Sequence, residues 1–107
     1  MKTAHSKYHA KRTTVGNKTF DSRKEANRFV ELTLMEKAKE IQDLKTQVKF
    51  PLIKKSPHGR EIAYKADFVY YQDGKMVVED TKGFRTDVYK LKKRIMAELY
   101  NIDIKET

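Results

Sequence analysis

The chain has 107 residues, of which 24 are Lys or Arg and 15 are Asp or Glu, so its formal net charge is +9. This length corresponds to one domain, and a hydrophobic fraction of 38% supports one modest core. The absence of Cys excludes disulfides, thiolate catalysis and Cys-ligated zinc. No apolar run reaches the roughly 18 residues of a transmembrane helix, and no apolar segment follows the basic N-terminus, so we expect a cytoplasmic protein.

The charge is distributed unevenly along the chain. Residues 1–24 hold seven basic residues and one acid, whereas acids outnumber bases four to three in residues 66–85. The acids of this second segment are Asp67, Asp73, Glu79 and Asp80. The overall excess of positive charge favours a polyanionic partner such as nucleic acid. An acidic region inside basic surroundings favours a functional site over a purely solubilising surface.

The N-terminal third predicts a flexible arm followed by a helix. Residues 1–19 lack apolar periodicity and indicate a flexible basic arm with a short strand at residues 18–20. Apolar residues at spacings of three and four predict a helix over residues 22–42. Ser22 and Glu25 fit a capping box, with Ser22 as N-cap. The apolar stripe of this helix consists of Ala26, Phe29, Val30, Leu34, Ala38 and Ile41.

Three strands are predicted after the first helix. Residues 46–53 form the first, and Pro51 favours an edge position because proline cannot donate to a ladder. Residues 62–72 and 75–82 form the other two. Asp73-Gly74 between them is typical of a two-residue type I′ hairpin turn.

A second helix and a final strand complete the chain. Thr86 is a suitable N-cap, and the helix is predicted to end at Asn101. Its apolar face is expected to contain Val88, Leu91, Ile95 and Leu99. Residues 102–106 alternate as a short strand. The expected fold class is therefore α/β, with a small mixed sheet of three antiparallel strands plus a final strand, flanked by two helices.

The hairpin turn fixes which residues face each other. With a two-residue loop, Gln72 pairs with Lys75, and the same register places Asp67 opposite Asp80 on one face. Directly opposed like charges destabilise a sheet. A divalent cation between the carboxylates removes this repulsion, and Mg²⁺ takes one or two carboxylates plus waters and phosphate oxygens. The sequence therefore predicts a Mg²⁺ site here, with Mn²⁺ able to substitute.

The same alternation selects the neighbours of this pair. Lys82 lies two residues after Asp80 and shares its face, so its ammonium can orient a water or stabilise charge on a phosphate. Glu79 points to the opposite face and is excluded from the site. An ordinary surface hairpin with an Asp80–Lys82 ion pair is the alternative.

Asp67, followed by Asp80-Thr81-Lys82 on the next strand, resembles the signature of the PD-(D/E)XK superfamily of restriction-endonuclease-like nucleases. Ala66 stands where the signature usually has Pro. The longer run from Phe20-Asp21-Ser22 to Glu79-Asp80-Thr81-Lys82-Gly83 is similar to short phage-encoded proteins of this superfamily. The resemblance covers roughly residues 18–105 and implies a restriction-endonuclease-like core in residues 20–107.

The resemblance also implies an activity. It predicts a metal-dependent endonuclease that hydrolyses DNA, expected to act on branched DNA in phage recombination or packaging, as Holliday-junction resolvases do. Glu25 is the implied helix acid, although it can be only the second half of the capping box, and Glu31 is its competitor. The carbonyl of Thr81 is expected to assist Asp67 and Asp80 in holding the metal, and Gln47 is a further candidate to approach the site.

Basic residues outside the site are expected to contact DNA phosphates and to make affinity depend steeply on salt. They are Lys11, Arg12, Lys18, Lys65, Lys90, Lys92, Lys93 and Arg94. Lys92 can equally lie on a solvated helix face. We expect a homodimer, with contacts from Tyr89, Met96 and Tyr100 of the second helix or Ile102 and Ile104 of the final strand. The alternative is a non-catalytic protein on the same fold that binds nucleic acid or an acidic host protein.

Overall fold

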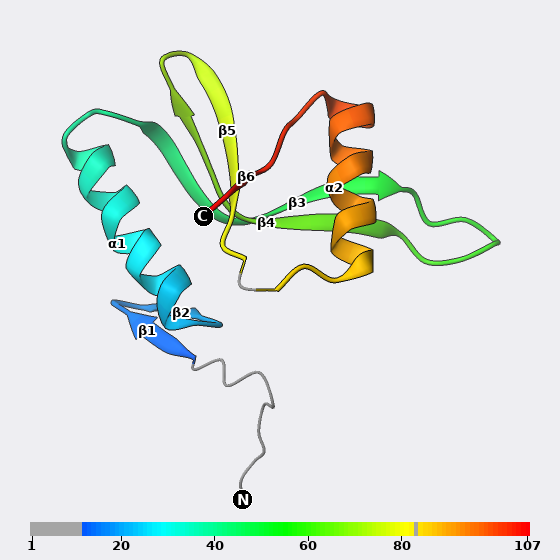
Figure 1. Cartoon of the computed structure of the whole chain (residues 1–107), viewed down its shortest axis with the longest axis horizontal. Coiled ribbons are helices and arrows are strands. Elements are labelled where there is room, and N and C mark those ends of the chain that lie inside the picture. Colours follow the sequence, from blue (N-terminus) through cyan, green and yellow to red (C-terminus); the bar gives the residue numbers. More distant parts are fainter. Residues whose placement is uncertain (1–11, 83) are drawn as a thin grey trace, which may run out of the picture.

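The structure is a computed structural model that describes residues 12–82 and 84–107. It confirms a mixed α/β architecture with two helices and a small mixed sheet (Figure 1). The elements in chain order are β1 (Thr13–Val15), β2 (Lys18–Phe20), α1 (Arg23–Lys37), β3 (Gln42–Ile53), β4 (Ile62–Gln72), β5 (Lys75–Asp80), α2 (Asp87–Tyr100) and β6 (Lys105–Glu106). Of the predicted nucleic-acid contacts, Lys11 lies outside the described residues.

The main sheet has the order β3-β4-β5-β6, with β6 parallel to β5 and the other pairs antiparallel. The edge position predicted for Pro51 is confirmed, because β3 is an outer strand. The predicted turn is confirmed as well, since Asp73 and Gly74 have φ angles of 53° and 77° and Gln72 pairs with Lys75. β1 and β2 form a separate two-stranded sheet, of which only β2 was predicted.

The helices begin where predicted. The Ser22 hydroxyl accepts a hydrogen bond from the Glu25 amide at 3.1 Å, and that of Thr86 accepts one from the Tyr89 amide at 3.0 Å. The prediction that the first helix continues to residue 42 is wrong, because α1 ends at Lys37 and the chain then turns through Lys39, whose φ is 64°. Neither α1 nor α2 has the length and apolar character that crossing a membrane requires.

Each helix covers its own part of the sheet, and the two lie at opposite ends of it (Figure 1). Ala26 and Leu32 of α1 pack with Phe68 and Tyr70 of β4 in one core. Tyr89 and Met96 of α2 pack in a second core with residues from several strands, namely Tyr64, Ala66, Val69 and Val78, and with Ile104. The protein therefore has two small cores on one sheet, and the single core expected from its composition is wrong.

The predicted core face of the second helix is largely wrong, although Ile95 is half-buried. Val88, Leu91 and Leu99 are 62%, 61% and 55% exposed, whereas Tyr89 and Met96 are buried. The Tyr89 hydroxyl donates to Glu106 at 2.8 Å, which fixes the rotation of α2 relative to β6. Tyr89 and Met96, and also the buried Ile104, are therefore unavailable for the dimer contact expected from them.

The predicted stripe of the first helix is correct only in part. Ala26 is buried and Phe29 is half-buried, but Val30 and Leu34 are exposed. The buried face instead includes Glu25 and Leu32. α1 is thus rotated so that a carboxylate, and not a purely apolar stripe, faces the sheet.

Candidate active site

The site lies where strand β4 changes the face that its side chains present. Ala66 belongs to the α2 core, whereas Phe68, which regular alternation places on the same face, belongs to the α1 core. Asp67 lies at this change. Because Thr46 pairs with Phe68 and Val48 with Ala66, residue Gln47 stands opposite Asp67. Gln47 has a φ of 55°, a left-handed conformation that is uncommon for a residue other than glycine and is often found at functional sites.

Asp67 and Asp80 come together as the hairpin register requires. Phe68 pairs with Glu79, so one further step of the register sets Asp67 opposite Asp80. The Thr81 amide donates to Asp67 Oδ2 at 2.9 Å. Burial, followed by the hydrogen bond and charge of Asp80, raises the pKa of Asp67 to about 8, although the Thr81 amide opposes this rise.

Lys82 is held between the acid pair and an aromatic ring. Its Nζ lies 3.2 Å from Asp80 Oδ2 and 4.2 Å from the centroid of the Tyr89 ring. The Tyr64 hydroxyl donates to the same Asp80 oxygen at 2.7 Å. Tyr64 and Tyr89 were not predicted as site residues, and the sequence carries no local signal for them because their contacts come from distant segments.

Glu25 of α1 reaches the same region. Glu25 is buried, and its Oε2 accepts a hydrogen bond from Gln47 Nε2 at 2.9 Å. Burial is the main cause that raises the pKa of Glu25, followed by the charges of Asp21 and Asp80, while Gln47 and Lys82 lower it. The competitor Glu31 is exposed and pairs with Arg28 at 3.3 Å, away from this cluster. The structure thus places Glu25, and not Glu31, beside the acid pair.

Glu79 has a different environment although it is adjacent to Asp80. Arg28 donates to both of its carboxylate oxygens, at 2.8 and 2.6 Å, and the Tyr70 hydroxyl donates to one of them. Burial alone would raise the pKa of Glu79, but these hydrogen bonds lower it below its usual value. Glu79 is therefore an ionised carboxylate whose charge is compensated by Arg28, and it lies on the α1 side of the sheet.

The donor set of the cluster suits a hard divalent cation. Within residues 12–82 and 84–107, no three His, Asp or Glu side chains adopt the geometry of a formed metal site. Asp67, Asp80 and Glu25 nevertheless act on one another electrostatically, and this repulsion contributes to the raised pKa values of Asp67 and Glu25. Two carboxylates with a third nearby match the oxygen ligands that Mg²⁺ takes in proteins.

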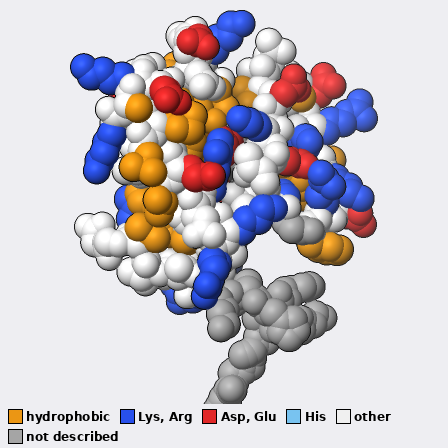
Figure 2. Space-filling view, turned by 60° about the vertical axis from the view of Figure 1, so that its left-hand side comes forward, with side chains coloured by type: hydrophobic (Ala, Val, Ile, Leu, Met, Phe, Trp, Pro, Cys, Tyr) orange, Lys and Arg blue, Asp and Glu red, His pale blue; other side chains and the backbone are white. Residues whose placement is uncertain are grey.

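The predicted nucleic-acid contacts lie on three separate parts of the fold. Arg12 and Lys18 belong to the β1–β2 region, Lys65 to β4, and Lys90, Lys92, Lys93 and Arg94 to α2. Most are exposed, but Lys92 and Lys93 are half-buried, and Lys93 pairs with Glu106 at 2.9 Å. Figure 2 shows Lys and Arg side chains around much of one face, with an apolar region among them.

Comparison with known proteins gives one match. No curated protein and no solved structure matches the chain. A family model described as "Protein of unknown function (DUF1064)" matches residues 5–107, which include every described residue of the site. The chain therefore belongs to the DUF1064 family.

Proposed function

We propose that the protein is a Mg²⁺-dependent endonuclease of the PD-(D/E)XK type, with a restriction-endonuclease-like core, that hydrolyses DNA in the cytoplasm. The observation that carries this proposal is the cluster of Asp67, Asp80, Lys82 and Glu25, in which Asp80 and Glu25 are buried and Asp67 and Lys82 are half-buried. A surface hairpin of ordinary charges would not bury Asp80 or bring a helix carboxylate to it.

Each side chain of the cluster has a distinct part in this proposal. Asp67 and Asp80, with the Thr81 carbonyl and Glu25, would hold Mg²⁺. When bound, the ion supplies Lewis-acid polarisation of the scissile phosphate. The Lys82 ammonium lies beside Asp80 and donates hydrogen bonds to the attacking water or to a phosphate oxygen, which stabilises developing negative charge. Tyr64 and Tyr89 are positioning residues, because they hold Asp80 and Lys82 in place.

The direct test uses four-way-junction, linear duplex and single-stranded DNA, each with Mg²⁺ and with EDTA. We expect Mg²⁺-dependent cleavage with preference for the junction, as befits phage recombination or packaging. Cleavage of no substrate, in either Mg²⁺ or Mn²⁺, contradicts the proposal.

One observation favours a second candidate, a DNA-binding protein that does not cleave. The Tyr64 hydroxyl and the Lys82 ammonium already contact Asp80, and the Thr81 amide donates to Asp67, so protein groups already compensate part of the negative charge of the acid pair. DNA binding that is equally strong with and without Mg²⁺, and without cleavage, would support this candidate.

The N-terminal segment gives a prediction about affinity. Residues 1–11 carry Lys2, Lys7 and Lys11 and no acid. Deleting them leaves β1 intact and should reduce the dependence of log K on log salt by about one to three, because each phosphate contact contributes about 0.9 on duplex DNA. Fluorescence anisotropy across a salt series measures the slope, and the cleavage rate at saturating DNA should not change. An unchanged slope would show that these residues do not contact phosphates.

The exposed face of α2 gives a prediction about oligomeric state. We propose that a second copy of the chain covers the exposed Val88, Leu91 and Leu99. Leu91 and Leu99 line a groove of about 490 Å³ between α2 and Leu52. Two copies supply the two symmetric cuts that a junction requires. Sedimentation equilibrium at micromolar concentration should show a dimer, and Leu91→Asp should make it monomeric. A monomeric wild type, or a Leu91→Asp protein that remains dimeric, contradicts this interface.

A further inference from the structure

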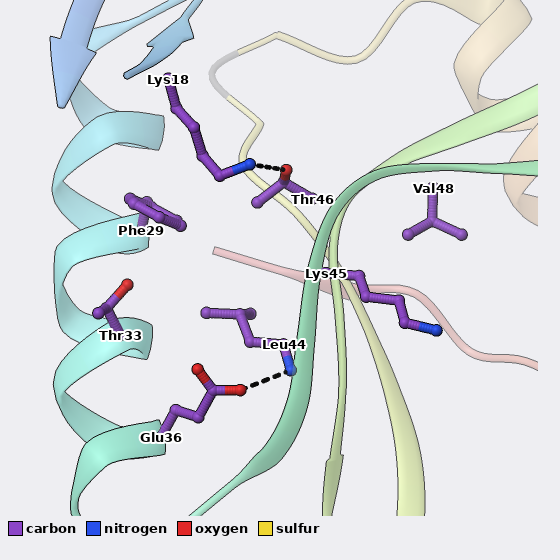
Figure 3. Close-up of a pocket in the computed structure, with 8 residues that line it drawn as sticks. All are labelled: Lys18, Phe29, Thr33, Glu36, Leu44, Lys45, Thr46 and Val48. Atoms are coloured by element: carbon purple, nitrogen blue, oxygen red, sulfur yellow. Dashed lines mark hydrogen bonds between the residues drawn. The ribbon is translucent and has the colours of Figure 1, made fainter. Parts of the chain in front are cut away.

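A cavity of about 570 Å³ lies between helix α1 and the outer strand β3 (Figure 3). The side chains of Phe29 and Thr33 line it from the helix, and that of Leu44 lines it from the strand. Its volume falls within the range of small-molecule sites, about 300–1,000 Å³. The carboxylate cluster uses none of these three residues.

The two ends of the cavity differ in charge. At one end Lys18 Nζ donates to Thr46 Oγ1 at 3.4 Å, and at the other end the Leu44 amide donates to Glu36 Oε2 at 2.9 Å. Figure 3 shows these two hydrogen bonds at opposite ends of the space between helix and strand. A ligand lying in the cavity therefore meets a cation at one end, apolar walls in the middle and a carboxylate at the other end.

A buried hydroxyl faces this space without a partner. Thr33 Oγ1 is inaccessible to solvent and has no hydrogen-bond partner among the described residues. Buried polar groups are nearly always hydrogen-bonded, so this exception indicates a group that a ligand can satisfy once the side chain turns to expose its oxygen to the cavity. In Figure 3 the Thr33 oxygen is directed toward the interior of the cavity.

The cavity adjoins the proposed active site. Thr46, at its Lys18 end, immediately precedes Gln47, whose side chain donates to Glu25. A nucleotide with its phosphate near Lys18 would therefore lie close to the strand whose phosphate reaches Asp67 and Asp80.

We propose that this cavity binds an unpaired nucleobase of the DNA strand, with the adjoining phosphate on Lys18. A base has flat apolar faces for Phe29 and Leu44 and polar edges for Thr33 and Glu36. The inference rests on the proposed function and specifies its substrate as DNA with unpaired bases, because a base in a continuous duplex cannot enter without leaving the stack. Branch points, flaps and single strands offer such bases at little cost.

The test measures binding in EDTA, so that cleavage plays no part. A fully base-bearing single-stranded oligonucleotide is compared by anisotropy with a series of strands, each of which has one abasic position at a different place along the strand. The wild type should bind the base-bearing strand about tenfold more tightly than the strand with one particular abasic position. Equal affinities for all abasic strands and the base-bearing strand would overturn the proposal.

Two variants link this preference to the cavity. Thr33→Met extends a longer side chain into the cavity and should reduce the preference for the base. Thr33→Val keeps the shape of the side chain but removes the hydroxyl, and it should weaken the binding of base-bearing DNA about fivefold. Thr33→Val should not lower the unfolding midpoint, because the lost hydroxyl has no partner. Thr14→Val, on the exposed face of β1, is the matched control and should retain wild-type binding. Retention of the base preference in both Thr33 variants contradicts the assignment.

Failure of the cavity assignment can be distinguished from failure of the proposed nuclease function. Base preference without any cleavage would leave the cavity assignment intact and overturn the nuclease. Cleavage without base preference would overturn the cavity assignment and leave the nuclease.

Discussion

Replacing Asp80 with Asn is expected to reduce Mg²⁺-dependent DNA cleavage by at least about a hundredfold while DNA binding survives or improves. The substitution removes a charge and little volume, so Tyr64 can still donate to the side chain while Mg²⁺ loses a carboxylate ligand. The phosphates also lose a repulsive neighbour. Cleavage rates and anisotropy on the same junction DNA measure the two effects separately.

The matched control is Asp73→Asn in the turn of the same hairpin. Asp73 has a φ of 53°, which Asn also adopts readily, and Asn-Gly is itself a favoured type I′ sequence. This variant has the same chemical change outside the cluster and should cleave at the wild-type rate. If Asp80→Asn also cleaves at the wild-type rate, the proposed metal site is wrong.

Replacing the neighbouring carboxylate, that of Glu79, should reduce the stability of the fold instead of the cleavage rate. Glu79→Gln is expected to lower the free energy of unfolding by about 3–5 kcal/mol, because it breaks a buried ion pair and leaves the Arg28 charge with only the exposed Glu31 as a partner. Chemical denaturation of the variant measures this loss. Asp80→Asn should cost much less stability, since it also relieves the repulsion with Asp67 and Glu25.

A double-mutant cycle tests the cause of that loss. In Glu79→Gln/Arg28→Met the orphaned charge is removed, so much of the lost stability should return. Additive losses from the two single substitutions would show that Arg28 and Glu79 do not stabilise the fold as a pair. Loss of cleavage in a folded Glu79→Gln protein would indicate that Glu79 also belongs to the active site.

The parts of the site that follow from local chemistry could be predicted from the sequence. The Asp73-Gly74 turn fixes the register over the next residues, and this is why the pairing of Asp67 with Asp80 and the opposite orientation of Glu79 could be derived. The helix starts at Ser22 and Thr86 depend on single side-chain caps and were likewise predictable.

The parts of the structure that depend on contacts between distant residues could not be predicted from the sequence. The rotation of α2 is set by Tyr89, which needs Glu106 for its hydroxyl, and an apolar stripe alone favours the wrong face. Arg28 and Glu79 are 51 positions apart, so no local pattern announces their pairing. The left-handed conformation of Gln47 arises where β3 and β4 redirect their side chains, and its sequence neighbours contain no glycine to mark it.

The existence of two cores has a mechanical consequence for the carboxylate cluster. Glu25 is carried by the helix of one core, whereas Lys82 rests on Tyr89 of the other, and the strands between them change face at Asp67. Any change in the bend of the sheet at Gln47 would therefore change the separation of Glu25 from Lys82, because each is carried by a different core. A cation or phosphate that contacts both Glu25 and Lys82 would connect the two cores. Ligand binding and the angle between the two halves of the sheet would therefore be coupled.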